Sequence, residues 1–402
     1  MDSGIQIQKK ARILLSTDTR LSIAILSPSV ILMLQFFVLN YFNILETSTG
    51  YAIQILSKLL VGCIFLCSFS SVIRKSLIVI VLTYSITGIV YLLNYIIFPV
   101  NSVYLNDVVF DFILICLPCF IYSYSITDIK ALELITQKAS MIIYTVDISL
   151  GLLVFIGKAS IDSYSMSFSY YLLLPTIIYL KKYFETYKFK YLFLSALSIL
   201  LIIAIGSRGA IMCLGVYVML YHLISIRKMT LPKALCVIIF TLILFISLIF
   251  FKEILLFLYN ILERFGISSR SIILFLRDGI YLSGREELYG KIVEQIFAHP
   301  LIGIGIAGDR YYLDGSYTHN IFLEILSGFG VFFGFILILT LLFTIFKSLF
   351  PKNIKGFDNI LVWFSIGFVP LLVSGSYLTD FQFWIFLGFA LGSLKLKKEN
   401  SI

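Results

Sequence analysis

Long apolar runs alternate along this chain with short polar segments that contain most of its lysines and arginines. A helix that crosses a bilayer needs about 20 mostly apolar residues. The sequence therefore predicts an all-α polytopic membrane protein that forms a single membrane domain over residues 1–402. We expect about twelve spanning helices, at 23–42, 51–73, 77–98, 108–126, 140–157, 167–180, 191–206, 209–226, 231–251, 319–346, 358–377 and 380–394.

The basic residues orient this layout. When the N-terminus is placed in the cytoplasm, 21 of the 31 lysines and arginines fall in segments on the cytoplasmic side. The short outer loops then hold only Lys158 and Arg208. This asymmetry is what the positive-inside rule predicts, so we expect both termini in the cytoplasm. One long extracytoplasmic loop, 252–318, separates the ninth and tenth predicted spans.

Composition narrows the class of protein further. The chain is 60% apolar and only 13% charged, with a mean hydropathy of +1.01. These values exclude a soluble enzyme, a disordered protein and a secreted disulfide scaffold. The basic residues behind the net charge of +9 lie in short segments between the apolar runs, where they mark membrane topology. We therefore expect no nucleic-acid partner. Cys116 and Cys119 spell a CxxC motif inside a predicted span, where packing is a better interpretation than redox chemistry.

The outer loop has its own local pattern. Residues 253–266 are apolar and are expected to lie on the membrane interface. Ser283 and Glu286 form a capping-box pattern that predicts a helix ending near His299 and Pro300. Glu287 and Lys291 form a favourable i,i+4 pair on this helix. Its apolar residues recur at helical spacing, at Leu288, Ile292, Val293, Ile296 and Phe297. The next segment, 303–308, matches GxGxxG, but no βαβ unit surrounds it. We therefore interpret it as a glycine turn that lets the backbone approach a ligand or the membrane surface.

Three side chains are predicted at the same outer membrane boundary: Arg208, Arg285 and His319. Charged groups near a membrane are costly, and they often mark function. Two guanidiniums suit a diphosphate, because each offers planar bidentate donors. The helix N-terminus near Arg285 adds positive potential. A histidine can accept a proton from a hydroxyl or donate a hydrogen bond to phosphate.

Structural alternatives stand beside each of these assignments. An arginine at a membrane edge can be an interfacial anchor. His319 and Asn320 can simply cap the tenth span, with Asn320 as the N-cap. Lys58 and Asp147 are intramembrane charges, and each is either a site residue or a structural partner of a neighbouring helix.

The order of the motifs resembles a known family. They are Ser207–Ala210, Ser283–Tyr289, His299–Gly305, Thr318–Leu326 and Gly328–Val331. Together they resemble the O-antigen ligase/polymerase superfamily of bacterial surface-polysaccharide assembly. The resemblance implies many spanning helices, an outward-facing catalytic loop and a place in the bacterial cytoplasmic (inner) membrane. It also implies inverting glycosyl transfer from an undecaprenyl-diphosphate-linked oligosaccharide, without a metal or another cofactor.

The resemblance also implies roles for individual residues. Arg208 and Arg285 would bind and neutralise the diphosphate, and His319 would act at the reacting centre with Asn320 in support. Arg310 and Glu286 are further substrate-binding candidates. The rivals of His319 for the role of general base are Glu286, Glu287 and Asp309.

The acceptor is left open by these motifs. A polymerase joins one lipid-linked repeat unit to another, whereas a ligase transfers the glycan to lipid A–core. We favour a polymerase, because the short apolar loop offers no obvious surface for a large lipid-core acceptor. Membrane lipid is an expected partner, and a chain-length regulator protein is a further candidate. The alternatives from other classes are a polysaccharide or lipid transporter, which would predict inverted repeats with broken helices, and a non-catalytic scaffold.

Overall fold

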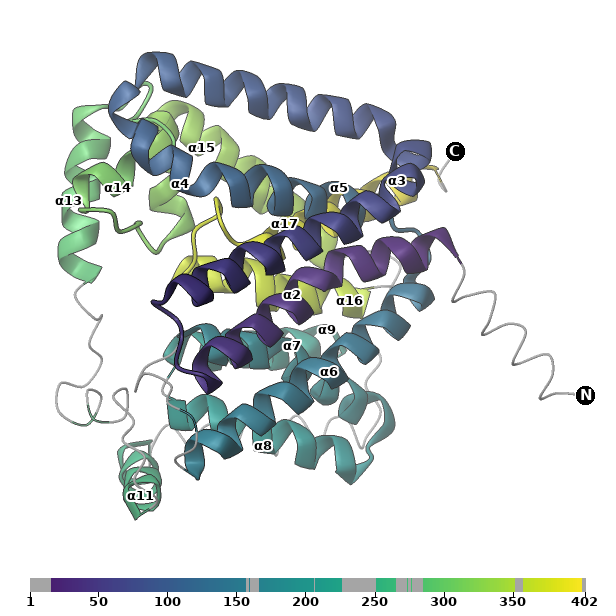
Figure 1. Ribbon diagram of the computed structural model, residues 1–402. Coiled ribbons are helices and arrows are strands. Elements are labelled where there is room, and N and C mark those ends of the chain that lie inside the picture. Colours follow the sequence, from purple (N-terminus) through teal and green to yellow (C-terminus); the bar gives the residue numbers. More distant parts are fainter. Residues whose placement is uncertain are drawn as a thin grey trace, which may run out of the picture. The chain divides into compact units, whose positions relative to one another are not determined.

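The computed structural model describes residues 16–156, 159, 166–205, 207–225, 251–264, 273, 276, 285–350 and 357–399. Within these ranges every regular element is a helix, as the predicted all-α class requires (Figure 1). The helices are α2 (Thr17–Tyr41), α3 (Ser48–Ile97), η1 (Pro99–Asn101), α4 (Ser102–Asp111), η2 (Phe112–Cys116), α5 (Leu117–Ser125), α6 (Ile129–Phe155), α7 (Met166–Thr186), α8 (Phe189–Ile205), α9 (Arg208–Ser225), α11 (Phe251–Arg264), α13 (Arg285–Ala298), α14 (Gly308–Tyr312), α15 (Ile321–Leu349), α16 (Phe357–Trp363), η4 (Phe364–Phe368), η5 (Val369–Leu372) and α17 (Phe381–Glu399).

Several of these helices are suited to cross a membrane. Among the described residues, five helical segments are long and apolar enough, namely Thr17–Tyr41, Ser48–Ile97, Pro99–Ser125, Ile129–Val154 and Ile321–Leu349. Shorter apolar helices cover Phe189–Ala204, Arg208–Ile224, Asp358–Leu372 and Phe381–Lys395. The chain is therefore a multi-pass membrane protein, and the count of twelve spans stays a prediction. The expected ninth span, 231–251, lies outside the described residues except for Phe251.

Two predicted spans, 51–73 and 77–98, are joined in the single helix α3 (Ser48–Ile97). Ser76 interrupts it with φ −149° and ψ 37°, and Figure 1 shows the chain changing direction within α3. The break follows Arg74 and Lys75, the polar pair that separates the two apolar runs. The prediction of two separate segments is thus correct in its boundary, although the helix resumes without a loop.

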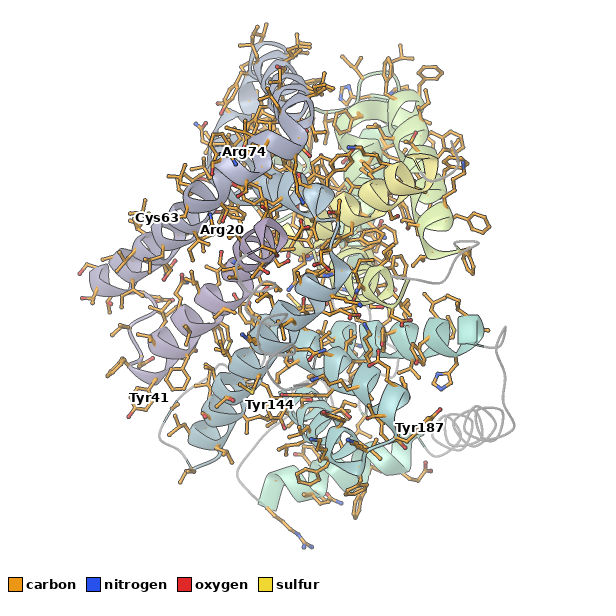
Figure 2. The ribbon with its side chains drawn as sticks, turned by 90° about the vertical axis from the view of Figure 1, so that its right-hand side faces the viewer. Arg20, Tyr41, Cys63, Arg74, Tyr144 and Tyr187 are labelled. Atoms are coloured by element: carbon orange, nitrogen blue, oxygen red, sulfur yellow. The ribbon has the colours of Figure 1, made fainter. Side chains whose placement is uncertain are left out.

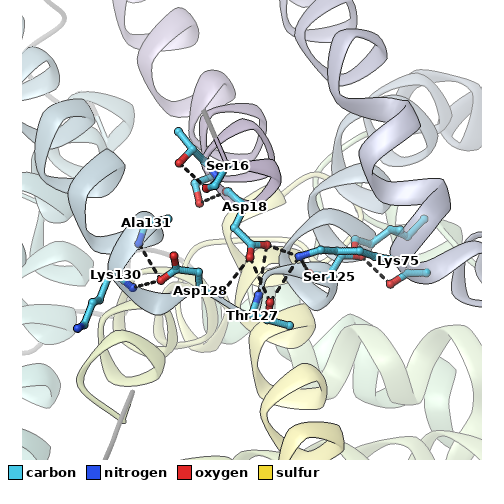
Figure 3. Close-up of polar contacts among 12 residues, drawn as sticks. Ser16, Asp18, Lys75, Ser125, Thr127, Asp128, Lys130 and Ala131 are labelled. Carbon is cyan, nitrogen blue, oxygen red and sulfur yellow. Dashed lines mark hydrogen bonds and ion pairs between the residues drawn. The ribbon is translucent and has the colours of Figure 1, made fainter. Parts of the chain in front are cut away.

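The helix ends that the layout places on the cytoplasmic side are tied together by Asp18 (Figure 3). Its carboxylate pairs with Lys75 and accepts hydrogen bonds from Thr127 Oγ1 at 3.1 Å and from the Asp128 backbone nitrogen at 3.2 Å. These groups lie at the start of α2, at the break in α3 and before α6. Arg20 and Arg74, on the same two helices α2 and α3, are labelled in Figure 2.

The described chain separates into two compact units. Unit 1 contains Met1–Leu32, Ala52–Ala139 and Ser283–Ile402, and unit 2 contains Met33–Tyr51 and Ser140–Leu282. In unit 1, α17 packs closely on α5, because Gly388 and Gly392 have no side chain that would hold the two helices apart. A Cβ at Gly388 would lie 2.4 Å from the Phe120 carbonyl oxygen, and one at Gly392 would lie 2.9 Å from the Tyr124 carbonyl oxygen. Small residues one turn apart allow such a close approach of membrane helices.

The two intramembrane charges noted in the sequence differ in their surroundings. In unit 1, Lys58 pairs with Asp111 of α4 at 2.8 Å, so its structural alternative is observed. In unit 2, Asp147 is fully buried, and neither of its carboxylate oxygens has a hydrogen-bond partner among the described residues. Cys116 and Cys119 are buried and free, which agrees with the packing interpretation.

Candidate active site

The predicted loop helix exists as α13 (Arg285–Ala298), in unit 1. Ile292 and Ile296 are buried in a cluster with Leu313 and residues of α15, so the expected apolar stripe packs α13 onto the next elements. Phe297 was expected on the same stripe, but its side chain is 76% exposed. The predicted pair Glu287–Lys291 is present at 3.1 Å. Ser283, the first half of the capping box, lies outside the described residues.

The glycine turn after α13 approaches protein backbone. The Ile304 nitrogen donates to the Ser327 carbonyl at 2.7 Å, and the Val331 nitrogen donates to the Pro300 carbonyl at 2.7 Å. These contacts enclose Gly330, where α15 is broken with φ 76° and ψ 171°. A Cβ at Gly303 would lie 2.2 Å from the Ser327 oxygen. The expected approach to a ligand or to the membrane is therefore replaced at Gly303 by packing against the break in α15.

Two asparagines at the far end of α3 and in η1 hold the same turn. Asn94 accepts a hydrogen bond from the Ile306 nitrogen at 2.7 Å and donates to the Ile306 carbonyl at 3.3 Å. Asn101 donates to the Ile304 carbonyl at 2.8 Å. Buried backbone groups need such partners, so these amides fix the loop onto the helical part of unit 1.

A buried charge network follows the turn. Arg310 on α14 lies between two carboxylates: its Nη1 is 3.0 Å from Asp309 Oδ1 and 3.6 Å from Glu324 Oε1. Its Nη2 donates to Ser376 Oγ at 3.0 Å, and that hydroxyl donates in turn to Glu324. The three charged side chains are each 2–6% exposed. The charge of Arg310 is thus paired with the buried carboxylate of Asp309, and such pairing is the condition under which charges are tolerated in an interior.

Asp309 connects this network to His319 through the intervening Thr318. The second carboxylate oxygen of Asp309 accepts hydrogen bonds from the Thr318 backbone nitrogen at 3.0 Å and from Thr318 Oγ1 at 2.9 Å. The next residue, His319, has φ 57°, a left-handed conformation that is costly outside glycine. Such a conformation persists only where neighbours hold it, and Thr318 is the nearest tethered neighbour.

The His319 side chain is half-buried between a ring and a carbonyl. Its ring centroid lies 4.1 Å from that of Tyr317, and its Nδ1 lies 3.4 Å from the Ser374 carbonyl oxygen. The Tyr317 hydroxyl donates to the same carbonyl at 2.8 Å. A proton on Nδ1 therefore faces Ser374, and this tautomer leaves Nε2 as the nitrogen with a free lone pair.

Burial is the main cause that lowers the pKa of His319 below its ordinary value of 6.5. The positive charges of Arg285 and Arg310 lower this pKa too, whereas the Ser374 hydrogen bond and the charge of Asp309 oppose them. The net effect favours the neutral imidazole at pH 7, which is the form that can accept a proton.

Asn320 caps α15, as the structural alternative predicted. Its Oδ1 accepts hydrogen bonds from the nitrogens of Phe322 at 3.0 Å and Leu323 at 3.2 Å. Its Nδ2 donates to the Leu372 carbonyl at 3.3 Å. The predicted tenth span began at His319, whereas α15 begins at Ile321 after the Asn320 cap. His319 therefore lies just before this helix.

The segment between η5 and α17 was missed as a functional element. Ser374 and Ser376 contact His319 and Arg310, as described above, and Asp380 caps α17 through hydrogen bonds from the nitrogens of Gln382 and Phe383. Burial raises the pKa of Asp380 to about 7. The signal in the sequence was a polar run between the last two apolar stretches, ending on an aspartate at an N-cap position.

Most of the expected site residues belong to one unit. Arg285, Arg310, His319 and Asn320 are all in unit 1, where the positive charge of Arg285 lowers the pKa of His319. Glu286 is exposed on α13. Arg208 is the first residue of α9, in unit 2, where the nitrogen of Ala210 donates to Ser207 Oγ at 3.4 Å.

A comparison with known proteins finds a family match over the region that contains these residues. Residues 193–339 match the family model described as O-antigen ligase, a stretch that contains Arg208, Arg285, Arg310 and His319. Neither a curated protein nor a solved structure matches the chain. The match to this family of membrane glycosyltransferases confirms the resemblance of the chain to the O-antigen ligase/polymerase superfamily.

Proposed function

We propose that this protein is an inverting glycosyltransferase that polymerises undecaprenyl-diphosphate-linked oligosaccharide repeat units into O-antigen or capsular polysaccharide. The reaction takes place at the outer face of the bacterial cytoplasmic membrane, with both chain termini on the cytoplasmic side. The observation that carries the proposal is the state of His319, a half-buried imidazole whose pKa is lowered and whose Nδ1 faces the Ser374 carbonyl.

The chemistry needs one base and one charge-neutralising group. The acceptor hydroxyl oxygen attacks the anomeric carbon of the donor sugar from the face opposite the diphosphate. His319 Nε2 accepts the hydroxyl proton, and the bond between the anomeric carbon and the diphosphate oxygen breaks. Undecaprenyl diphosphate departs with the bonding electrons, and the configuration at the anomeric carbon inverts. The donor is already activated, so stabilising the leaving charge and removing one proton suffice.

Arg285 is the proposed partner of the departing diphosphate. Arg285 begins α13, so the positive end of that helix adds to its own charge. The positive charge of Arg285 lowers the pKa of His319, so it helps to keep the base neutral before reaction. The same charge attracts the anionic donor. Arg208 enters the proposal through its place in the matching family segment.

A ligase that transfers the glycan to lipid A–core is the second candidate, and the family match favours it equally. Both activities use the same donor and the same base, and they differ in the acceptor. Purified protein supplied with the lipid-linked repeat unit alone separates them. A polymerase extends the glycan under these conditions, whereas a ligase forms product only after lipid A–core is added.

The role of the three named residues is tested with single alanine variants of Arg208, Arg285 and His319 at matched expression. We expect shortened or absent glycan ladders for each variant. Ladders of normal length and yield in all three variants would refute the enzymatic proposal.

A further inference from the structure

We infer that Asp309 is a positioning residue that holds His319 in place through Thr318, and that Arg310 is the counter-ion of Asp309 and no ligand of the substrate. This inference rests on the proposed function, because it explains how the proposed base is kept in its orientation. It also gives Arg310 a role different from the substrate binding expected for it.

Asp309 and Thr318 make a double contact. One carboxylate oxygen accepts from both the backbone nitrogen and the hydroxyl of Thr318, at 3.0 and 2.9 Å. The contact joins α14 to the residue that immediately precedes His319. Two bonds from one residue to one oxygen fix both its backbone and its side chain, so Thr318 has little freedom to rotate.

This tether supports an uncommon backbone conformation at His319. His319 has φ 57°, and the next residue, the N-cap Asn320, has an extended backbone conformation with φ −150°. Asn320 fixes the segment from the far side by capping α15. Between these two anchors, the left-handed residue sets the direction in which the imidazole leaves the backbone.

The guanidinium of Arg310 already has partners at both of its terminal nitrogens. Its Nη1 is paired with Asp309 and lies near Glu324, and its Nη2 donates to Ser376. The side chain is 6% exposed. A guanidinium that is buried and paired in this way would have to break these contacts to reach a diphosphate. Arg285, which is only partly buried on α13, has no such obstacle among the described contacts.

The test removes the hydroxyl of Thr318 and leaves its shape unchanged. Thr318→Val deletes the bond from Oγ1 to Asp309, and Thr318→Ser retains a hydroxyl at the same position. Thr344→Val is the matched control, because Thr344 is also buried and its hydroxyl donates only to Thr340 of its own helix at 2.8 Å. The three variants and the wild type are purified and assayed with the lipid-linked repeat unit.

For Thr318→Val we expect kcat to fall about tenfold while KM for the donor stays within about twofold, because a misplaced base slows the chemical step without removing a binding contact. Thr318→Ser should recover most of the lost kcat, and Thr344→Val should match the wild type. A Thr318→Val variant with unchanged kcat, or one whose loss lies in KM alone, would overturn the inference.

A second readout does not depend on glycan synthesis. The chain contains three histidines, so protein labelled with ¹⁵N-histidine gives a simple imidazole spectrum, and His319→Gln identifies the His319 signals. We expect Thr318→Val to shift or broaden the His319 signals and to leave those of His222 and His299 unchanged. An unperturbed His319 signal in a folded Thr318→Val protein would overturn the inference. An inactive wild type with the expected spectral change would refute the proposed function alone.

Discussion

Asn94 and Ile306 exchange two hydrogen bonds: the Ile306 nitrogen donates to Asn94 Oδ1 at 2.7 Å, and Asn94 Nδ2 donates to the Ile306 carbonyl at 3.3 Å. A single buried side chain thus satisfies both backbone groups of a residue more than 200 positions further along the chain. The exchange attaches the loop that precedes His319 to the far end of α3.

Replacing Asn94 with leucine should therefore loosen the loop. The variant leaves the buried Ile306 nitrogen without its acceptor, whereas the Ile306 carbonyl keeps the hydrogen bond from Asn101 Nδ2 at 3.3 Å. We expect a loss of roughly 2 kcal/mol in the free energy of unfolding. The apparent Tm of the detergent-solubilised protein measures this loss. Asn40→Leu is the control, because Asn40 donates only to Phe36 of its own helix. Equal Tm values for the two variants would contradict the account.

The contact between the glycine turn and α15 gives a second prediction. Gly303 and Gly330 have φ 68° and 76°, and a Cβ at Gly330 would lie 2.5 Å from the Leu301 carbonyl oxygen. Gly330→Ala and Gly303→Ala should each destabilise the protein by more than about 1 kcal/mol, since the backbone must move. Gly290→Ala is the matched control: it lies inside α13 with no neighbouring atom within 4 Å, so it should be neutral or slightly stabilising. Stable Gly303→Ala and Gly330→Ala variants would show that the turn is not packed as described.

Asp380 predicts a pH dependence of stability. Its pKa is raised by burial from about 3.8 to about 7. A carboxyl whose folded pKa exceeds its unfolded pKa destabilises the fold as pH rises from the unfolded to the folded value. Asp380→Asn keeps an acceptor oxygen for the α17 cap and removes the charge. The Tm advantage of this variant should therefore grow between about pH 4 and pH 7 and stay constant above. An advantage independent of pH, or one that shrinks over this range, would refute the assignment.

The lowered pKa of His319 predicts that catalysis becomes faster as pH rises. Its pKa lies below 6.5, so the neutral form predominates at pH 7. The value of kcat/KM should rise with pH through an apparent pKa below 6.5 and then reach a plateau. Because Arg285 lowers this pKa, Arg285→Ala should move the His319 titration, followed by ¹⁵N NMR, to higher pH. A titration that moves to lower pH in Arg285→Ala, or a rate that falls as pH rises through this range, would contradict the role of a neutral base.

Much of the fold could be predicted, because its helices follow apolar runs that the membrane requires. The boundary at Ser76 was visible in the charges of Arg74 and Lys75, and the Asn320 cap was visible in the residue type that precedes the tenth run. Arg285 and His319 were recognisable as boundary charges. Each of these signals is local, so one stretch of sequence is sufficient to find it.

The contacts that complete the site are not local. The pairing of Arg310 with Glu324 and Ser376 depends on how α14, α15 and the segment before α17 meet. A positive φ at His319 cannot be read from the sequence, because it is uncommon for every residue type other than glycine. Glu324 did carry a signal, as a carboxylate inside a predicted span, and intramembrane charge is a reason to look for a partner.

His319 is the proposed base of a glycosyl transfer from a lipid-linked donor. The most direct measurement is glycan formation from purified undecaprenyl-diphosphate-linked repeat units by the wild type and by His319→Ala, at equal concentration and with equal Tm. If His319 is the base, we expect extended glycan from the wild type and a rate at least about a hundredfold lower from His319→Ala. Equal rates of glycan formation by the two proteins would contradict this role.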